Sequence, residues 1–316
     1  MDVFRSDALE QLRGCHGFMW RHRHVPRDRA LATRLLPVVE RELRMPVYPD
    51  QDTCWHYDDK IAQAYLLSAA GVPTPRTWVF WDAGEARAFA REARYPLVLK
   101  LYAGASSRNV TRLDRPADAL RWIERLFGVG TRGVDAAFGE RRLGRSERLA
   151  VAARALFAAR HAEPAHDREL LHRGYLLVQQ LVPDTTCETR VMVIGDRAFG
   201  RRRINGRGDW RASGHGRSDP DPGQIDPAAV RLAFAVARRL GTQSLAVDML
   251  HHEGRPLVHE VSYCFSSWKV RICPGHWTLK GSPEEGALDW CEGAMWGEQA
   301  QLADFLARLE AHPRGP

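Results

Sequence analysis

The sequence predicts an α/β protein: a small N-terminal α/β domain followed by two α+β subdomains. Three observations lead to this fold class. Segments with apolar residues at every third or fourth position alternate with short apolar, strand-like segments. Pairs of strand-like segments separated by short polar turns dominate the second half. The 316 residues also suffice for a core divided over two or three subdomains.

The elements follow in order along three expected domains, residues 1–57, 58–174 and 175–316. The first is expected to hold a helix over residues 27–44 between short apolar segments at 17–21 and 45–48. In the second we expect helices at 58–71, 83–93 and 117–127, strands at 77–81, 95–102 and 109–113, and an Arg- and Ala-rich helical arm at 130–173. In the third we expect strands at 175–182, 187–194, 197–204, 244–250 and 257–263, and helices at 226–240 and 299–311.

Composition narrows the classes of function. No apolar run reaches the length of a membrane span and the N-terminus lacks a signal-peptide pattern, so we expect a cytoplasmic protein without a membrane partner. The six cysteines form no CxxC pair, which gives a zinc knuckle little support. The net charge of +7 fits either nucleic acid or small anionic ligands. No nucleic-acid fingerprint is present, so nucleic acid is not the expected partner.

The segments at 244–250 and 257–263 carry one acid each, Asp248 and Glu260. If their connecting loop is centred near Gly254, the two carboxylates face each other on one side of a hairpin. Like charges in that position are destabilising, and their burial is costly without a cation. Mg²⁺ would resolve the conflict, because it is commonly held by one or two carboxylates together with substrate phosphates. Two solvated acids on an outer face are the alternative.

Other segments carry groups suited to anions, each with a plain structural alternative. Lys100 ends an apolar strand ahead of a small-residue loop, Gly104, Ala105, Ser106 and Ser107, whose backbone can approach phosphates closely; an edge lysine facing water is the alternative. Lys60 follows two aspartates at a helix start, where capping alone explains the cluster. Gln179, Gln180, Leu181 and Val182 fit the edge of an adenine ring or merely the end of a strand. Arg190, Arg203 and Arg211 would make an anion pocket if they converge, and otherwise are solvated.

The order of these pieces resembles the ATP-grasp superfamily, in particular its ribosomal-protein-S6-modifying, glutathione-synthetase-like branch. The resemblance covers roughly residues 56–265. Its most specific parts are Asp59-Lys60 with residues 70–75, residues 98–100 with the loop that follows, and Asp248 followed by residues 259–261. It implies an ATP-grasp fold in which the two α+β subdomains clamp ATP. Dimers and tetramers are frequent in the superfamily, so a homodimer is one assembly it allows.

The resemblance also assigns roles to residues. Lys60 and Lys100 would hold the ATP phosphates, residues 104–108 would cover the triphosphate, and Gln179, Gln180, Leu181 and Val182 would form the adenine hinge. Glu188 and Arg190 match the acid-x-Arg strand of the family, and residues 209–213 match its aromatic-Arg-Ser-Asn segment. Asp248, Glu260 and Ser262 would hold Mg²⁺, one or two ions that Mn²⁺ can replace. Ser262 stands where the family usually has asparagine, and the Pro-Gly that usually follows is absent.

The implied activity is an ADP-forming ligation of a carboxylate to an amine through an acyl phosphate, with Arg190, Arg203 and Arg211 steadying that intermediate. A phosphotransferase on the same fold and a non-catalytic nucleotide-binding protein are the alternatives. Small-molecule or peptide acids and amines are the expected partners, contacted by residues around Trp20, His22 and His24, by the 130–173 arm and by the 263–280 tail. We further expect Asp248→Asn and Glu260→Gln to lower turnover far more than folding.

Overall fold

The computed structural model describes residues 1–104, 109–134, 170–205, 210 and 217–311. The chain divides into two compact units, which we call the first unit (Met1–Pro75 and Val182–Pro316) and the second unit (Arg76–Leu181). These divisions differ from the expected boundaries at 57/58 and 174/175, and the three-domain scheme stays a prediction. The segment after residue 58 belongs to the first unit because the side chain of Gln63 accepts a hydrogen bond from the Val261 backbone at 3.2 Å and Leu67 joins the core there.

The second unit is an antiparallel sheet covered by two helices. Its described strands lie in the order β3-β6-β4-β5, and α5 and α6 pack on them through an apolar cluster that includes Leu99, Trp122 and Ile123. The side chain of Asp82 caps α5 by accepting from the Glu85 backbone at 2.8 Å, and Pro116 begins α6. The bounds are β3 (Thr77–Phe80), α5 (Ala83–Glu92), β4 (Leu97–Lys100), β5 (Val110–Leu113), α6 (Pro116–Phe127) and β6 (Leu176–Gln180).

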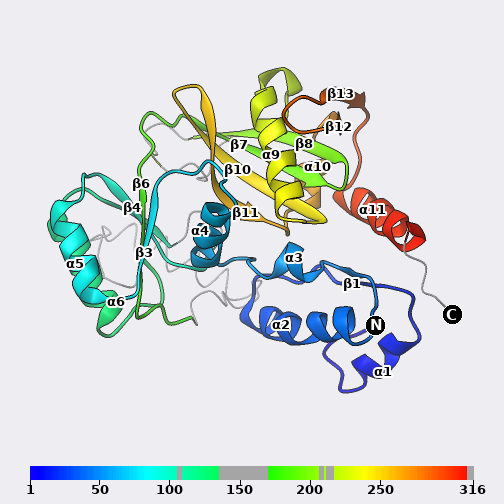
Figure 1. The fold of residues 1–316 in the computed structure, drawn as a ribbon, viewed down its shortest axis with the longest axis horizontal. Helices are drawn as coiled ribbons and strands as arrows, with labels where there is room; N and C mark the ends of the chain where they lie inside the picture. Colours follow the sequence, from blue (N-terminus) through cyan, green and yellow to red (C-terminus); the bar gives the residue numbers. More distant parts are fainter. Residues whose placement is uncertain (105–108, 135–169, 206–209, 211–216, 312–316) are drawn as a thin grey trace, which may run out of the picture. The chain divides into compact units, whose positions relative to one another are not determined.

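The N-terminal part of the first unit is a small α/β layer (Figure 1). It contains α1 (Ala8–Arg13), β1 (Phe18–Met19), α2 (Pro26–Arg41), β2 (Val47–Tyr48), α3 (Gln51–Cys54) and α4 (Lys60–Ala69). Strands β1 and β2 are parallel, as expected for two strands joined by a helix. The hydroxyl groups of Tyr48 and Ser244 lie 2.6 Å apart, and the Gln243 side chain donates to the Val47 carbonyl at 2.8 Å. These bonds fasten the layer to the large sheet.

The large sheet of the first unit runs in the order β11-β10-β7-β8-β12-β13, with β9 paired to β8, among the residues described. Its elements are β7 (Cys187–Ile194), β8 (Arg197–Ile204), β9 (Arg217–Asp219), the 3-10 turn η2 (Pro222–Gln224), α9 (Pro227–Arg239), β10 (Ser244–His252), β11 (Arg255–Ser262), α10 (Ser267–Arg271), β12 (Gly275–Lys280), β13 (Ala287–Glu292) and α11 (Gly297–Ala311). None of the described helices is both long and apolar enough to cross a bilayer.

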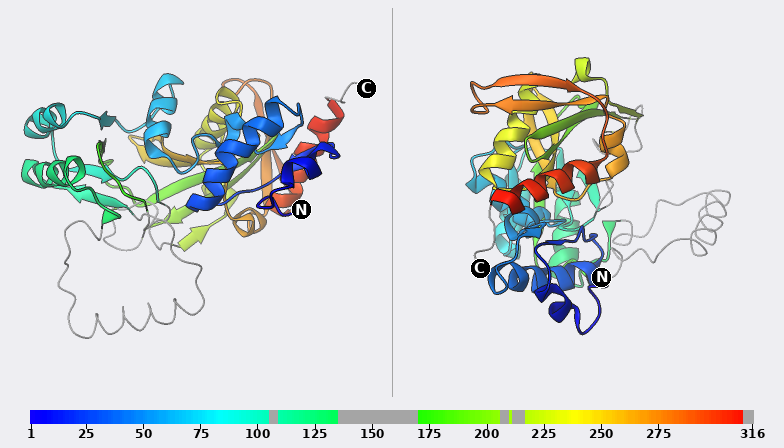
Figure 2. Two further views of the ribbon diagram at one scale, coloured as in Figure 1. Left: turned by 90° about the horizontal axis from the view of Figure 1, so that it is seen from below. Right: turned by 90° about the vertical axis from the view of Figure 1, so that its right-hand side faces the viewer.

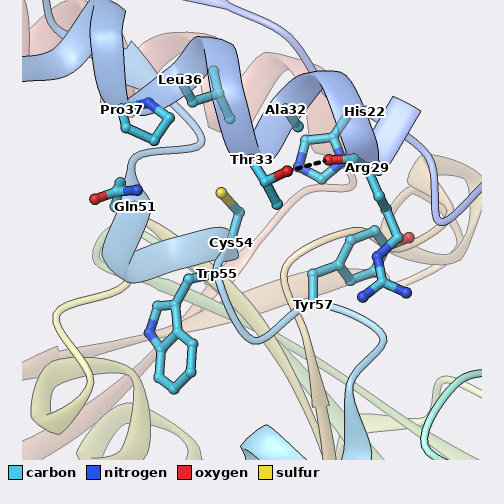
Figure 3. Close-up of a pocket in the computed structure, with 10 residues that line it drawn as sticks. All are labelled: His22, Arg29, Ala32, Thr33, Leu36, Pro37, Gln51, Cys54, Trp55 and Tyr57. Carbon is cyan, nitrogen blue, oxygen red and sulfur yellow. Dashed lines mark hydrogen bonds between the residues drawn. The ribbon is translucent and has the colours of Figure 1, made fainter. Parts of the chain in front are cut away.

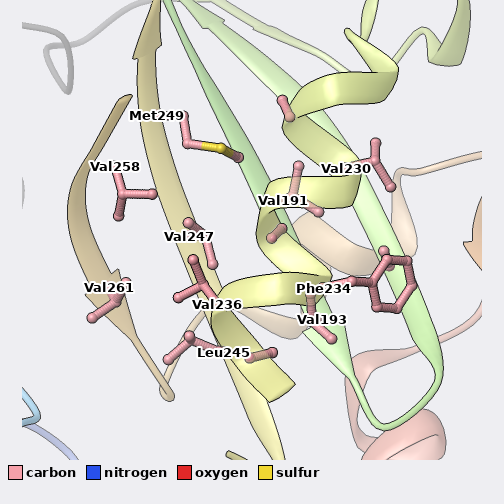
Figure 4. Packing of buried hydrophobic residues seen from close by; sticks show 14 of the residues in the cluster. Val191, Val193, Val230, Phe234, Val236, Leu245, Val247, Met249, Val258 and Val261 are labelled. Atoms are coloured by element: carbon pink, nitrogen blue, oxygen red, sulfur yellow. The ribbon is translucent and has the colours of Figure 1, made fainter. Parts of the chain in front are cut away.

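The two faces of this sheet differ. One face packs against α9, where Val191, Val247 and Val258 meet Val230 and Phe234 (Figure 4). The opposite face is apolar at one end, where α10 and α11 pack on it (Figure 2). The cluster there contains Met192, Ile194, Phe199, Ala246, Val270 and Ala300. Further along the same strands, this second face turns polar, because the alternating positions that follow hold charged residues.

The expected helices and strands are present wherever the chain is described, and the structure adds elements that the pattern did not reveal. Helix α10 and strand β12 lie in the 263–280 tail that we expected to contact substrate, and β13 follows that tail. The 130–173 arm lies largely outside the described residues. The helix predicted at 58–71 runs from Lys60 to Ala69, with Asp59 accepting from the Ile61 and Ala62 backbones and Gly71 at a φ of +65° just past its end.

Candidate functional site

One end of the second face gathers charged side chains from four neighbouring strands. Glu260, Asp248, Arg190 and Arg201 stand opposite one another in a single row across β11, β10, β7 and β8. Glu188 and Arg203 form a second pair in register on β7 and β8. We call this set, which also includes His259, the charged face: Glu188, Arg190, Arg201, Arg203, Asp248, His259 and Glu260. Arg190 and Arg203, two of the three arginines that would form an anion pocket if they converged, therefore lie on one face.

The predicted opposition of Asp248 and Glu260 is confirmed, but it arises by a different route. The hairpin turn has two residues, Glu253 and Gly254, both with positive φ, so a regular ladder would pair Asp248 with His259. The register shifts by one residue between Asp248 and Met249, which pairs with Val258. His259 is the extra residue of this β-bulge, and the shift brings Glu260 opposite Asp248.

The bulge also places the imidazole of His259 on the charged face. Its Nε2 lies 3.2 Å from Oε1 of Glu188, a side chain without solvent exposure. Sequence reasoning did not single out His259, because a bulge leaves no mark in an alternating pattern. The contact between His259 and Glu188 therefore links β11 to β7 across β10.

Asp248 is held by two arginines. Nε and Nη2 of Arg190 both donate to its carboxylate, and Nη2 of Arg203 lies 3.1 Å from Oδ2. Arg203 also donates to Glu188. Burial alone would raise the pKa of Asp248, but the charges of Arg190 and Arg203 outweigh burial and hold the pKa below its usual value. The cation beside Asp248 is thus a pair of guanidinium groups, and these two arginines have protein carboxylates as partners.

Glu260 has a different partner. Nζ of Lys60, a side chain only 7% exposed at the start of α4, lies 3.5 Å from Oε1 of Glu260. The Glu260 side chain is 27% exposed, against 2% for Asp248. Ser262 follows two residues later on β11, and its hydroxyl donates to the Cys264 carbonyl at 2.8 Å. Lys60, Glu260 and Ser262 therefore line the more open side of the charged face.

The donor set fits Mg²⁺ in chemistry, since Asp248, Glu260 and Ser262 offer only oxygen atoms. Asp248 already accepts three hydrogen bonds, which leaves one of about four lone-pair sites on its carboxylate. Glu260 is the better-placed ligand because its carboxylate is more accessible. No group of three or more His, Cys, Asp or Glu side chains with metal-site geometry occurs among the described residues.

The remaining predicted residues of the described chain lie in or beside the second unit. Lys100 is buried at the end of β4, and Gly104 has a φ of +131° beside Asn109, whose side-chain amide donates to the Ala103 carbonyl at 2.8 Å. Gln179 on β6 donates to Thr77 at 2.9 Å, and Gln180 is exposed. The division between the units falls between Leu181 and Val182. Ala105, Ser106, Ser107 and Arg211 lie outside the described residues, so their roles stay predictions.

A separate pocket lies in the N-terminal layer, between α2 and the segment that contains α3 (Figure 3). It has a volume of about 100 Å³, and its polar lining comes from His22, Arg29, Thr33 and Gln51. Burial lowers the pKa of His22 to about 4, and it does the same for the neighbouring, fully buried His56. Both imidazoles are therefore neutral at pH 7.

These two histidines predict a loss of stability in acid. The unfolded chain takes up protons near pH 6.5 that folded His22 and His56 do not accept until about pH 4. The free energy of unfolding should therefore fall as the pH drops from 6.5 to 4, by up to about 3 kcal/mol for each histidine. Urea unfolding at several pH values measures this slope. In His56→Phe, the slope of the unfolding free energy against pH should decrease by the equivalent of about one proton. In the control His16→Asn, where the histidine is exposed, the slope should not change. Equal slopes in the two variants would contradict a lowered pKa for His56.

Comparison with known proteins agrees with this fold. Residues 156–269 match the family model of the RimK-like ATP-grasp domain. The chain is 24% identical over 242 residues to the alpha-aminoadipate–LysW ligase LysX of Saccharolobus solfataricus, which covers 76% of this chain and 72% of that protein. It is 27% identical over 265 residues to the N5-carboxyaminoimidazole ribonucleotide synthase of Mycobacterium bovis, covering 83% of this chain but 49% of that protein.

The chain thus spans about half the length of the Mycobacterium bovis protein. Among solved structures, the ADP complex of an N5-carboxyaminoimidazole ribonucleotide synthetase superimposes with a TM-score of 0.53 at 14% identity, over 90% of this chain and 62% of that one. Residues 156–269 therefore carry the likeness of this chain to the RimK-like ATP-grasp domain, and the fold of the chain resembles that of the ribonucleotide synthetase.

Proposed function

We propose that the protein is an ATP-dependent carboxylate–amine ligase that forms an amide bond and releases ADP and phosphate. The observation that carries the proposal is the row of Glu260, Asp248 and Arg190 across β11, β10 and β7, with Lys60 beside Glu260. In this row Glu260 and Asp248 would hold a divalent cation, and Lys60 beside Glu260 would neutralise phosphoryl oxygens. The relatives described above are named as a ligase and as synthases, which supports the same chemistry.

In the proposed reaction, an oxygen of the substrate carboxylate attacks the γ-phosphorus of ATP, and the bond from that phosphorus to the β-phosphate oxygen breaks to release ADP. The amine nitrogen then attacks the acyl carbon, phosphate leaves, and the nitrogen gives up a proton. No protein nucleophile is required, so positioning and charge neutralisation are the protein's contribution. Lys60 would neutralise phosphate charge, and Arg190 and Arg203 would hold the site rigid through Asp248 and Glu188.

Glu260, Asp248 and the hydroxyl of Ser262 are the residues that would hold Mg²⁺, as one ion or two, with Mn²⁺ as a substitute. The ion would supply neutralisation of the charge on the transferred phosphoryl group. Lys100, the residue 104–107 loop and the segment 179–182 would contribute to nucleotide binding as the resemblance implies. A small-molecule or peptide acid and an amine as substrates, a homodimer and a cytoplasmic location are further parts of the proposal.

The proposal predicts Mg²⁺-dependent ATP binding that requires Lys60 and Lys100. Isothermal titration calorimetry should show binding by the wild type with Mg²⁺, and a loss of at least tenfold in affinity for Lys60→Met and Lys100→Ala, since each removes a charge-assisted contact. Lys280→Ala is the control, because Lys280 is 79% exposed and pairs with Asp289 on the neighbouring strand. Folded wild type that binds no ATP would remove the nucleotide assignment.

A screen of acids and amines for ADP release distinguishes the alternatives. A ligase releases ADP only when both an acid and an amine are present and yields an amide. A phosphotransferase needs one acceptor and yields a stable phosphorylated product. Binding of ATP without ADP release under any pair would favour a non-catalytic nucleotide-binding protein.

A further inference from the structure

Arg201 differs from every other charged residue of the charged face. Its side chain is buried, with the residue 4% exposed, yet no carboxylate within the described part of the chain contacts it. Nη1 donates to the hydroxyl of Ser218 on β9 at 2.9 Å, and Nε is buried without an acceptor among the described residues. A buried guanidinium group normally has an anionic partner, because removing its charge from water is costly.

The row across the sheet shows which charge lacks a partner. From β11 to β8 it reads Glu260, Asp248, Arg190 and Arg201, two acids followed by two bases. The two inner residues bind each other, and Lys60 meets Glu260 at the acidic end. At the basic end, no acidic side chain in the described part of the chain pairs with Arg201 as Lys60 pairs with Glu260.

Other cations surround Arg201. Arg190 stands directly opposite on β7, a like-charge pair that destabilises a sheet by itself. The Cys273 sulfur lies 3.3 Å from the Gly200 carbonyl and 3.4 Å from the Lys269 carbonyl, so the backbone of α10 at Lys269 lies near β8. Burial and the charges of Arg190 and Arg203 lower the pKa of Arg201 to about 10. Burial and the charges of Arg201 and Arg203 lower the pKa of Lys269 as well.

We propose that Arg201, with its hydrogen-bond partner Ser218 and with Lys269 on α10, binds the carboxylate of the acid substrate. A carboxylate accepts two parallel hydrogen bonds from a guanidinium group and would supply the missing negative charge at this end of the row. A phosphate group would satisfy the same donors. We favour the carboxylate because Lys60, Lys100 and Glu260 with its cation account for the nucleotide phosphates under the proposed function, on which this inference rests.

Replacement of Arg201 by methionine tests the proposal. Removing a charge that lacks a partner should leave the melting temperature of the free protein unchanged or higher, whereas removing a structural arginine would lower it. Millimolar acetate or glutarate should raise the melting temperature of the wild type and not that of Arg201→Met. Arg197→Gln is the control on the same strand, because Arg197 pairs with Asp196 at 3.0 Å, and it should behave as the wild type.

With a substrate pair in hand, Arg201→Met should raise the KM for the acid about 10- to 100-fold with little change in the KM for ATP, and Arg201→Lys should restore part of the loss. Stabilisation of the wild type by inorganic phosphate but not by carboxylates would overturn the proposal, as would a carboxylate response that survives in Arg201→Met. Failure of the wild type to bind ATP would instead count against the proposed function, because the carboxylate response does not involve nucleotide.

Discussion

Asp248→Asn is expected to destabilise the protein by about 3–5 kcal/mol, the range typical of removing one partner from a buried ion pair. The variant leaves Arg190 and Arg203 without the carboxylate that both contact, although Arg203 keeps its bond to Glu188. The asparagine amide can accept hydrogen bonds but brings no charge to match theirs. This result would differ from the sequence-based expectation, in which Asp248→Asn affects turnover far more than folding. Urea unfolding of the wild type and the variant measures the difference.

A second variant separates the loss of charge balance from a loss of packing. In Arg190→Met/Asp248→Leu both members of the buried pair become apolar, which often restores stability in such pairs. The double variant should therefore be more stable than Asp248→Asn while remaining unable to turn over ATP. Asp289→Asn, which breaks the exposed pair with Lys280, should cost less than about 1 kcal/mol. An Asp248→Asn protein as stable as Asp289→Asn would show that the arginines do not depend on Asp248.

Glu260→Gln is expected to have the opposite profile, with a large loss of activity and a small change in stability. The Glu260 side chain is 27% exposed and its partner Lys60 lies at 3.5 Å, so the folded state depends on it only weakly. If Glu260 holds the divalent cation, removal of its charge should lower ADP release by roughly 100-fold or more, in line with several kcal/mol of charge stabilisation by a metal ion. ADP release at saturating ATP, measured over a range of Mg²⁺ concentrations, gives both effects.

The Mg²⁺ concentration for half-maximal activity should also rise in Glu260→Gln, because one of two carboxylate ligands is lost. The matched control is Glu253→Gln at the tip of the same hairpin, where the side chain is exposed and lies within the two-residue turn. It should keep the activity and Mg²⁺ dependence of the wild type. Wild-type Mg²⁺ dependence in Glu260→Gln would exclude Glu260 as a metal ligand.

Local patterns were sufficient to predict most of the elements and part of the site. The alternation of apolar residues in β10 and the turn residues near Gly254 predicted that two acids face each other, although the bulge at His259 is what brings them into register. The spacing in α4 placed Lys60 at its start. Arg190 and Arg203 were singled out because they fall on two neighbouring strand-like segments, and Glu188 because it matches the acid-x-Arg strand of the ATP-grasp family. These features depend on residues close together in sequence or on strands joined by short turns.

The remainder depends on contacts between distant segments. The pairing of β12 with β8, which joins residues near 277 to residues near 198, has no local signal because neither strand is next to the other in sequence. The partners of the arginines could not be predicted from the sequence either. Arg190 and Arg203 appeared available to a ligand, and the strand register is needed to show that they bind Asp248 and Glu188. Arg201 was passed over because three consecutive arginines look alike until the strand separates their faces.

The bulge at His259 has a consequence for length variation in this hairpin. A single-residue deletion within a strand ordinarily turns every later side chain to the other face of the sheet. Here β11 is one residue longer than its pairing with β10 requires, since Val258 pairs with Met249 and Glu260 with Asp248. Deleting His259 would therefore convert the bulged ladder into a regular one and keep Glu260 and Val261 on the faces they now occupy. The strand can lose this one residue while the later side chains stay on their faces of the sheet. The deletion would remove the imidazole that lies beside Glu188.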